Sequence, residues 1–131
     1  MVPATANRMA RRHQDLVCWQ LADELRQLII KHTADGTPAG KDYRFTSNLR
    51  DAISSACRNQ AEGFAKFTHK SQRPYFNTAR SSLKETEDGI RDGELRGHFS
   101  QDVATGMDTL CRRASIANLR YLQSLSRPDP K

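Results

Sequence analysis

The chain has 131 residues, of which 37% are hydrophobic and 27% charged, and its formal net charge is +6. This length predicts one domain that buries a core without a disulfide or metal. Few glycines, prolines and aromatic residues favour helices over a sandwich or barrel. Leu16 to Trp19 is the longest apolar run, so we expect no membrane-spanning helix. Residues 1–14 are basic and polar, unlike a secretory signal.

The first helix is expected over residues 15–33, where Cys18, Leu21, Leu25 and Leu28 recur at steps of three and four. Two glycines and a proline in residues 34–40 end it and form the longest loop. A second helix is expected over residues 42–67, capped by Asp42. Its inner stripe is small and becomes polar toward its end: Phe45, Leu49, Ala52, Ile53, Ala56 and Gln60.

The third helix is expected over residues 71–91. Ser71 is the predicted cap, Pro74 falls in the first turn, and Asp92-Gly93 ends the helix. Its seam follows steps of three and four: Phe76, Ala79, Leu83, Thr86 and Ile90.

The fourth helix is expected over residues 100–125, with Ser100 as its cap. Beside its main seam it carries further apolar residues, including Ile116, Leu119 and Leu122. We interpret these three as an oligomer contact, and the alternative is a wide core face. The four helices predict an all-α fold, an antiparallel up-down-up-down four-helix bundle. Residues 1–14 are expected to be a flexible basic arm, and residues 126–131 a frayed tail.

Catalytic and metal-binding patterns are missing from the sequence. The four histidines show no paired spacing, and there is no Cys-x-x-Cys, His-Glu-x-x-His or glycine-rich phosphate loop. Cys18, Cys57 and Cys111 lie far apart in helical stretches, which is typical of reduced thiols in a cytosolic protein. We therefore expect no metal, no cofactor and no enzymatic activity, and a cytoplasmic location.

Positive charge is unevenly distributed along the chain. Residues 66–84 carry five basic residues and no acidic one, whereas residues 85–94 are mainly acidic. Such stretches attract phosphate, and Phe67, His69 and Tyr75 interleave with the first of them. The alternatives are solvated helix faces and core aromatics. The predicted nucleic-acid-binding residues are Arg8, Arg11, Arg12, Lys66, Lys70, Arg73, Arg112, Arg113 and Arg120.

Four blocks resemble one known family. They are Asp15-Leu16 with Trp19-Gln20, Ala22 and Leu25; residues 44–52 (RFTSNLRDA); Ser55 with residues 59–64 (NQAEGF); and residues 79–85 (ARSSLKE) with Glu87. Together they resemble the bacterial four-helix-bundle proteins first noticed as reading frames within intervening sequences of 23S ribosomal RNA genes. The chain departs from the family pattern at Cys57, Gln60, Ser81 and Thr86, and Pro74 replaces a glutamate that would complete a capping box with Ser71.

The resemblance implies a cytosolic bundle that assembles as a homopentamer and is suspected of associating with nucleic acid. A more distant likeness is to the accessory bundle of diversity-generating retroelements, a basic pentamer that partners a reverse transcriptase. The partners expected for this chain are therefore other copies of itself and RNA or a nucleic-acid-processing protein.

The polar residues of the matching blocks are predicted to form a structural clasp between the second and third helices. Because these helices are antiparallel neighbours, Asn59 and Glu62 could meet Arg80. The predicted clasp residues are Asn59, Glu62, Arg80, Ser82 and Glu85. The alternative is a polar pocket.

The sequence thus predicts a self-assembling bundle that binds RNA or another nucleic acid. The competing hypothesis is a protein–protein adaptor or scaffold that docks a partner on the last helix.

Overall fold

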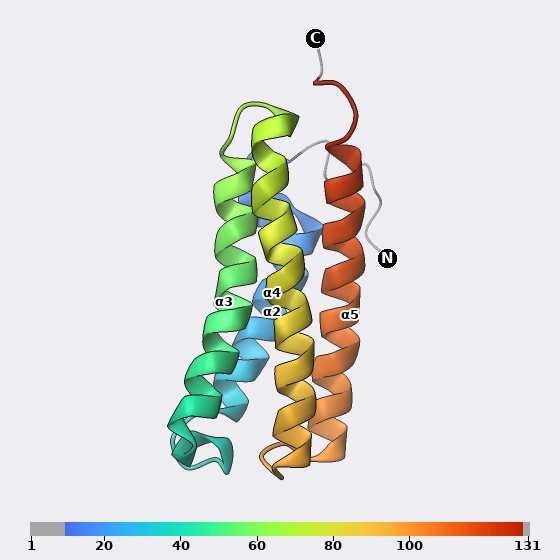
Figure 1. The fold of residues 1–131 in the computed structure, drawn as a ribbon. Helices are drawn as coiled ribbons and strands as arrows, with labels where there is room; N and C mark the ends of the chain where they lie inside the picture. The colour runs from blue at the N-terminus through green and yellow to red at the C-terminus, as the bar shows by residue number, and fades with distance from the viewer. Residues whose placement is uncertain (1–9, 130–131) are drawn as a thin grey trace.

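The computed structural model describes residues 10–129, and in these residues it contains four α-helices and no strand. The helices are α2 (Val17–His32), α3 (Tyr43–Phe64), α4 (His69–Leu95) and α5 (Gln101–Ser124). Two short 3₁₀ helices precede them, η1 (His13–Asp15) before α2 and η2 (Ala39–Lys41) before α3. The helices alternate in direction and stand side by side, as Figure 1 shows. The predicted all-α antiparallel bundle is therefore confirmed.

Each helix packs against two others, in the cyclic order α2, α3, α4, α5, so α3 and α5 are diagonal to one another. The two sets of helix ends consequently form two distinct ends of the bundle. One end holds the start of α2, the end of α3, the start of α4 and the end of α5. The other holds the loops that contain η2 and residues 96–100.

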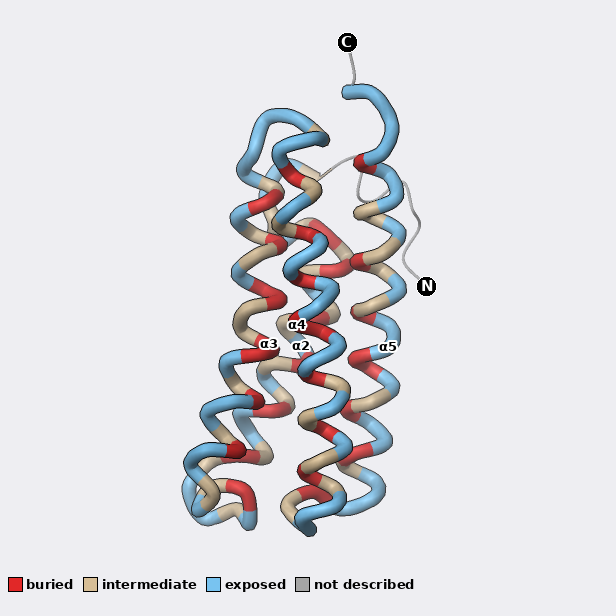
Figure 2. The backbone as a smooth tube through the Cα atoms, in the orientation of Figure 1, coloured by how far each residue is buried: buried red, intermediate tan, exposed pale blue. Residues whose placement is uncertain are grey.

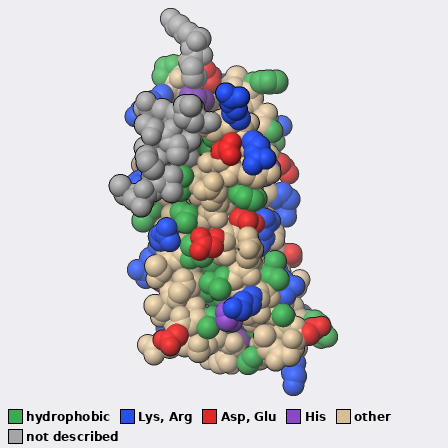
Figure 3. All heavy atoms as spheres, turned by 180° about the vertical axis from the view of Figure 1, so that it is seen from behind, with side chains coloured by type: hydrophobic (Ala, Val, Ile, Leu, Met, Phe, Trp, Pro, Cys, Tyr) green, Lys and Arg blue, Asp and Glu red, His purple; other side chains and the backbone are tan. Residues whose placement is uncertain are grey.

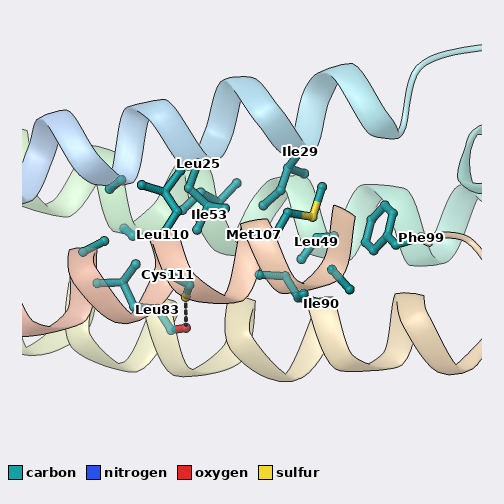
Figure 4. Close-up of a cluster of buried hydrophobic side chains, with 14 of the residues drawn as sticks. Leu25, Ile29, Leu49, Ile53, Leu83, Ile90, Phe99, Met107, Leu110 and Cys111 are labelled. Carbon is teal, nitrogen blue, oxygen red and sulfur yellow. Dashed lines mark hydrogen bonds between the residues drawn. The ribbon is translucent and has the colours of Figure 1, made fainter. Parts of the chain in front are cut away.

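Each of the four helices carries a stripe of buried residues, and Figure 2 shows these as red bands that recur along every helix. A main cluster fills the middle and the loop end, and Figure 4 shows its members projecting from every helix toward one another. In this cluster the thiol of Cys111 on α5 donates to the carbonyl oxygen of Leu83 on α4, at 3.4 Å. A second cluster, of Leu16, Cys18, Phe76 and Leu125, closes the opposite end.

Two caps were predicted correctly. The Asp42 carboxylate accepts from the backbone N–H of Phe45, and the Ser100 hydroxyl accepts from that of Val103. The predicted start of α4 was wrong, because Thr68 caps this helix and Ser71 completes a reciprocal capping box with it. Pro74 consequently lies inside the helix rather than in its first turn.

The predicted end of α4 was also wrong. The helix continues through Gly93 to Leu95. The chain turns at Gly97, whose φ of 77° lies in the left-handed region that favours glycine. Gly93 is buried, and only glycine fits there, because a Cβ would lie 2.5 Å from the ring of Phe99 and 2.8 Å from that of Phe45. This glycine provides room for packing instead of a helix stop.

All three cysteines are free and buried. Burial raises the pKa of Cys18 and Cys111 to about 12 and that of Cys57 to about 11, so the thiols stay protonated at neutral pH. None of the helices in residues 10–129 is long and apolar enough to cross a membrane.

Candidate nucleic-acid interface

Basic residues that are far apart in the sequence meet at one end of the bundle. This basic end is formed by residues before α2, around the α3–α4 turn and at the end of α5. Its cations are Arg11, Arg12, Lys66, Lys70, Arg73, Arg120 and Arg127. The carboxylates at this end are Asp15, Glu62 and Asp129, so positive charge is in excess. Arg8 lies outside the described residues.

The α3–α4 turn presents the most exposed features of the basic end. Phe67 is fully exposed, and Lys66 and Lys70 are exposed on either side of it. The Lys66 ammonium lies 5.2 Å from the ring centroid of Tyr75, a cation–π contact that holds this half-buried aromatic under the turn. Phe67 is therefore free to stack on a ligand, whereas Tyr75 already has a partner.

Arg127 and Asp129 of the C-terminal tail contact the start of α4, unlike the frayed tail expected over residues 126–131, of which residues 130–131 lie outside the described residues. The Asp129 carboxylate accepts from the backbone N–H of His69 at 2.8 Å, and the Arg127 carbonyl oxygen lies 2.8 Å from His69 Nδ1. His69 is the first residue of α4, so Asp129 satisfies an N–H that has no partner within the helix. The first turn of α4 contains no acidic residue, and the tail supplies the anion there.

The charges along α4 oppose its macrodipole. Lys70 and Arg73 lie in the first turns, where the helix dipole favours anions, and Asp92 and Glu94 lie in the last turns, where it favours cations. This order costs stability, so local helix energetics do not account for it. It does give α4 a basic half and an acidic half, at opposite ends of the bundle.

The acidic half of α4 lines a groove of about 500 Å³ between α3 and α4. The charged residues of this acidic groove are Asp42, Arg44, Asp51, Glu85, Asp88, Asp92 and Arg96. Asp42 Oδ2 lies 2.9 Å from His98 Nε2 and 3.4 Å from Arg96 Nη1. The bond from His98, the backbone N–H of Phe45 and the Arg96 charge together lower the pKa of the Asp42 carboxyl.

The remaining predicted binding residues are spread along the surface. Arg11 and Arg12 are exposed before η1, where the backbone N–H groups of both residues lower the pKa of Asp15. Arg112 and Arg113 are exposed near the middle of α5, and Arg112 is paired with Asp108 at 2.9 Å. The structure thus brings the Lys66, Lys70 and Arg73 set together with Arg11, Arg12 and Arg120, and leaves Arg112 and Arg113 apart from them.

The predicted clasp is not formed as expected. Glu62 and Arg80 are both exposed, and within residues 10–129 neither belongs to a salt bridge. Asn59 instead turns back on its own helix and donates to Ser55, and Glu85 is exposed at the acidic groove. Of the predicted clasp residues, Ser82 does bond across the two helices, because its hydroxyl lies 2.8 Å from that of Ser55 on α3.

A different polar contact lies in the core and was not predicted. Gln60 on α3 and Asn118 on α5 are both fully buried and joined by a 2.9 Å hydrogen bond. Asn118 also donates to the Phe76 carbonyl oxygen of α4 at 3.1 Å. Helical periodicity places Gln60 on the inner stripe of α3, but nothing in the sequence indicates its partner 58 positions away.

The residues proposed as an oligomer contact are unequally exposed. Ile116 is 52% exposed, whereas Leu119 and Leu122 are half-buried, and Leu122 packs against the second core cluster. A wide core face therefore accounts for Leu122, and Ile116 is the part of this surface that faces outward.

A second groove, beside the start of α2, was also not predicted. It has a volume of about 230 Å³ and is lined by Trp19 and Arg26 of α2, by α3 and by His13. Trp19 and Arg26 are seven positions apart, which places them on the same helix face, and this spacing was a signal available in the sequence. Figure 3 shows the side of the molecule that carries α2, where side chains of both charges are interspersed.

Within residues 10–129, no group of three His, Cys, Asp or Glu side chains is close enough to hold a metal ion. No curated protein matches the chain at a significant level. The sequence pattern of the 23S rRNA-intervening sequence proteins matches residues 14–117, which is most of the chain and includes all of α2, α3 and α4. The chain therefore belongs to the family of 23S rRNA-intervening sequence proteins.

Proposed function

We propose that this protein is a non-enzymatic cytoplasmic bundle that self-assembles and binds RNA through its basic end. The observation that carries this proposal is the convergence of Lys66, Lys70 and Arg73 with Arg11 and Arg12, beside the fully exposed Phe67. Cations neutralise phosphates, and an exposed aromatic ring stacks on unpaired bases. Single-stranded RNA presents such unpaired bases, so RNA is the class of nucleic acid proposed.

The placement of charge on α4 supports the same proposal. Cations at a helix N-terminus oppose the macrodipole, and such local conflicts are expected where a surface serves binding. Self-assembly would multiply these contacts, because several weak sites on one particle bind one strand together. A homopentamer is the assembly that the family resemblance implies.

The test is fluorescence anisotropy of a labelled single-stranded RNA 20-mer, titrated with the full chain at several salt concentrations. We expect binding at low salt that weakens steeply as salt is added. Replacing Lys66, Lys70 and Arg73 with Gln should weaken binding and reduce the slope of log K against log salt by about 2, or about 0.7 for each lost phosphate contact.

A matched control carries the same change in charge at the opposite end. Lys31, Lys41 and Arg44 are exposed there and belong to no salt bridge within residues 10–129. Their triple Gln variant should retain most of the affinity. Absence of RNA binding at low salt, or equal losses in the two variants, would contradict RNA binding at the basic end.

Self-assembly is tested by solution mass with and without nuclease. The 52% exposed Ile116 on α5 is the reason to expect a contact there, and Ile116→Asp should lower the mass. Ile30→Asp on α2, where Ile30 is 46% exposed, is the matched control and should leave it unchanged. A nuclease-insensitive monomer would exclude both the assembly and its contribution to RNA affinity.

The second candidate function is an adaptor that docks a partner protein on α5. Ile116 also favours this function, because a large apolar side chain with half its surface in water is available to a partner. Capture of one stoichiometric protein that survives nuclease treatment and is lost in Ile116→Asp would support the adaptor over the RNA-binding bundle.

A further inference from the structure

Trp19 is held rigidly on the wall of the 230 Å³ groove. Its half-buried ring packs against both core clusters. The guanidinium carbon of Arg26 lies over the ring at 6.0 Å from its centroid, and the His13 ring meets it edge-on at 5.1 Å. Arg26 is itself fixed by Asp23, which accepts from its Nε at 3.1 Å. The groove therefore presents an aromatic ring beside a planar cation that is already oriented.

The opposite wall comes from α3 and supplies Ser54, Cys57 and Arg58. Cys57 is buried and its pKa is raised by desolvation to about 11, so this wall carries no negative charge at neutral pH. Arg58 is exposed and forms no salt bridge with any residue in 10–129. The residues lining the groove include no carboxylate, and Asp23, which acts on Cys57 from beside the groove, is already paired with Arg26, so Arg58 contributes a positive charge without an acidic partner among the described residues.

The geometry points to a binding site for one unpaired nucleotide of single-stranded RNA, with the base stacked on the outer face of Arg26, which covers Trp19, and a phosphate at Arg58. Unpaired bases stack on aromatic rings and on arginine planes, and guanidinium groups bind phosphate oxygens at two points. The groove is smaller than the ~300–1,000 Å³ of a typical small-molecule pocket. One base is therefore the appropriate size of ligand.

The place of the groove in the fold links it to the basic end. His13 and Trp19 lie at the start of α2, and Arg58 and Ala61 lie near the end of α3. Lys66, Arg11 and Arg12 lie at this same end of the bundle, so the inference places one base of a strand bound along them in the groove. This inference rests on the proposed RNA binding, but it assigns residues that the basic end does not include.

Trp19 is the only tryptophan of the chain, so its fluorescence reports on this groove alone. The full chain is titrated with a uridine octanucleotide and, in parallel, with an abasic oligomer that carries the same number of phosphates. Binding is followed independently by anisotropy of an end label, and free N-acetyltryptophanamide corrects for absorption. We expect the octanucleotide to quench Trp19 emission and the abasic oligomer to bind without quenching it.

Arg58→Gln is the test variant and Arg80→Gln its control. Both arginines are exposed, both changes remove one positive charge, and Arg80 lies on α4 away from the groove. Arg58→Gln should weaken octanucleotide binding about tenfold and abolish most of the quenching, whereas Arg80→Gln should change affinity less than threefold. Circular dichroism should show the same helix content and melting temperature in both.

The outcomes separate this inference from the proposed function. If no oligomer binds at low salt, the proposed function itself fails. If the octanucleotide binds but leaves Trp19 emission unchanged, or if the two variants bind equally, RNA binding stands and the nucleotide site is wrong. If emission depends on protein concentration without RNA, a second copy covers the groove, and this also overturns the nucleotide site.

Discussion

Gln60 and Asn118 join the two helices that are diagonal in the bundle. Gln60 Nε2 donates to Asn118 Oδ1 at 2.9 Å, with both side chains fully buried, while Gln60 Oε1 has no partner within the described structure. Asn118 also donates to the Phe76 carbonyl oxygen, so three helices meet at this amide. A hydrogen bond across a bundle core favours one alignment of the helices over shifted ones.

Removing Asn118 should destabilise the protein more than removing Gln60. Gln60→Leu leaves only Asn118 Oδ1 unpaired, whereas Asn118→Leu leaves both polar atoms of Gln60 buried without partners. We expect losses of about 1–3 kcal/mol in the free energy of unfolding, larger for Asn118→Leu. The double variant should lose less than the sum of the two. Urea denaturation of the parent, the two single variants and the double variant measures these losses. Strict additivity would mean that the Gln60 and Asn118 side chains are not energetically coupled.

Gly63 allows α3 and α4 to approach closely. A Cβ at this position would lie 2.7 Å from the Tyr75 Cβ and 2.8 Å from the ring of Phe76. Gly63→Ala should therefore destabilise the protein by about 1–3 kcal/mol through overpacking. Gly106 on α5 is the control, because a Cβ there meets nothing within 4 Å. Gly106→Ala should stabilise by up to about 1 kcal/mol, and opposite shifts in melting temperature verify the difference.

The Asp42 interactions predict a pH dependence of stability. The pKa of Asp42 is lowered in the folded state, chiefly by the hydrogen bond from His98. The ionised carboxylate therefore stabilises the folded state in full above the unfolded pKa of about 3.9. The contribution is lost as the pH falls through the lowered value. Asp42→Asn keeps a capping side chain but removes the charge. The variant should be less stable than the parent at pH 7, and the difference should shrink near pH 3.

The control for the Asp42 experiment is Asp35→Asn, since Asp35 is exposed in the loop before η2. Its melting temperature should follow that of the parent at both pH values. A difference for Asp42→Asn that stays constant with pH would contradict the role of the Asp42 charge.

Asp129 links the C-terminal tail to the start of α4. Asp129→Asn should lower stability by about 0.3–1 kcal/mol, because the anion at the helix N-terminus is lost. The loss should diminish in high salt, which screens an exposed charge. Hydrogen exchange at the His69 amide, measured by NMR, should accelerate in the variant. Unchanged protection of this amide would show that the tail does not cap α4 in solution.

The polar groups between α3 and α4 are expected to differ in importance. Glu62→Gln and Arg80→Gln should each change stability by less than about 0.5 kcal/mol, because both side chains are exposed. Ser82→Ala removes the 2.8 Å bond to Ser55 in a nearly buried position and should cost about 0.5–1.5 kcal/mol. A larger loss of stability for Glu62→Gln than for Ser82→Ala would support the predicted clasp at Glu62.

The four helices, their inner stripes and two of their caps could be predicted from the sequence. Hydrophobic periodicity and capping depend on residues within about one turn of each other, so the information is local. The start and end of α4 were missed for physical reasons. Thr68 and Ser71 both suit a cap, and Ser71 takes the N3 position that glutamate usually occupies. Gly93 resembles a helix stop until its packing under Phe99 is known.

Only the tertiary structure decided which distant residues meet. Stretches near residues 11, 66 and 120 each carry positive charge, but antiparallel packing alone places them at one end of the bundle. The same packing pairs Gln60 with Asn118, seats Asp129 on His69 and forms the groove around Trp19. Such contacts depend on helix order and register. These are set by the whole core and are not encoded in any single segment.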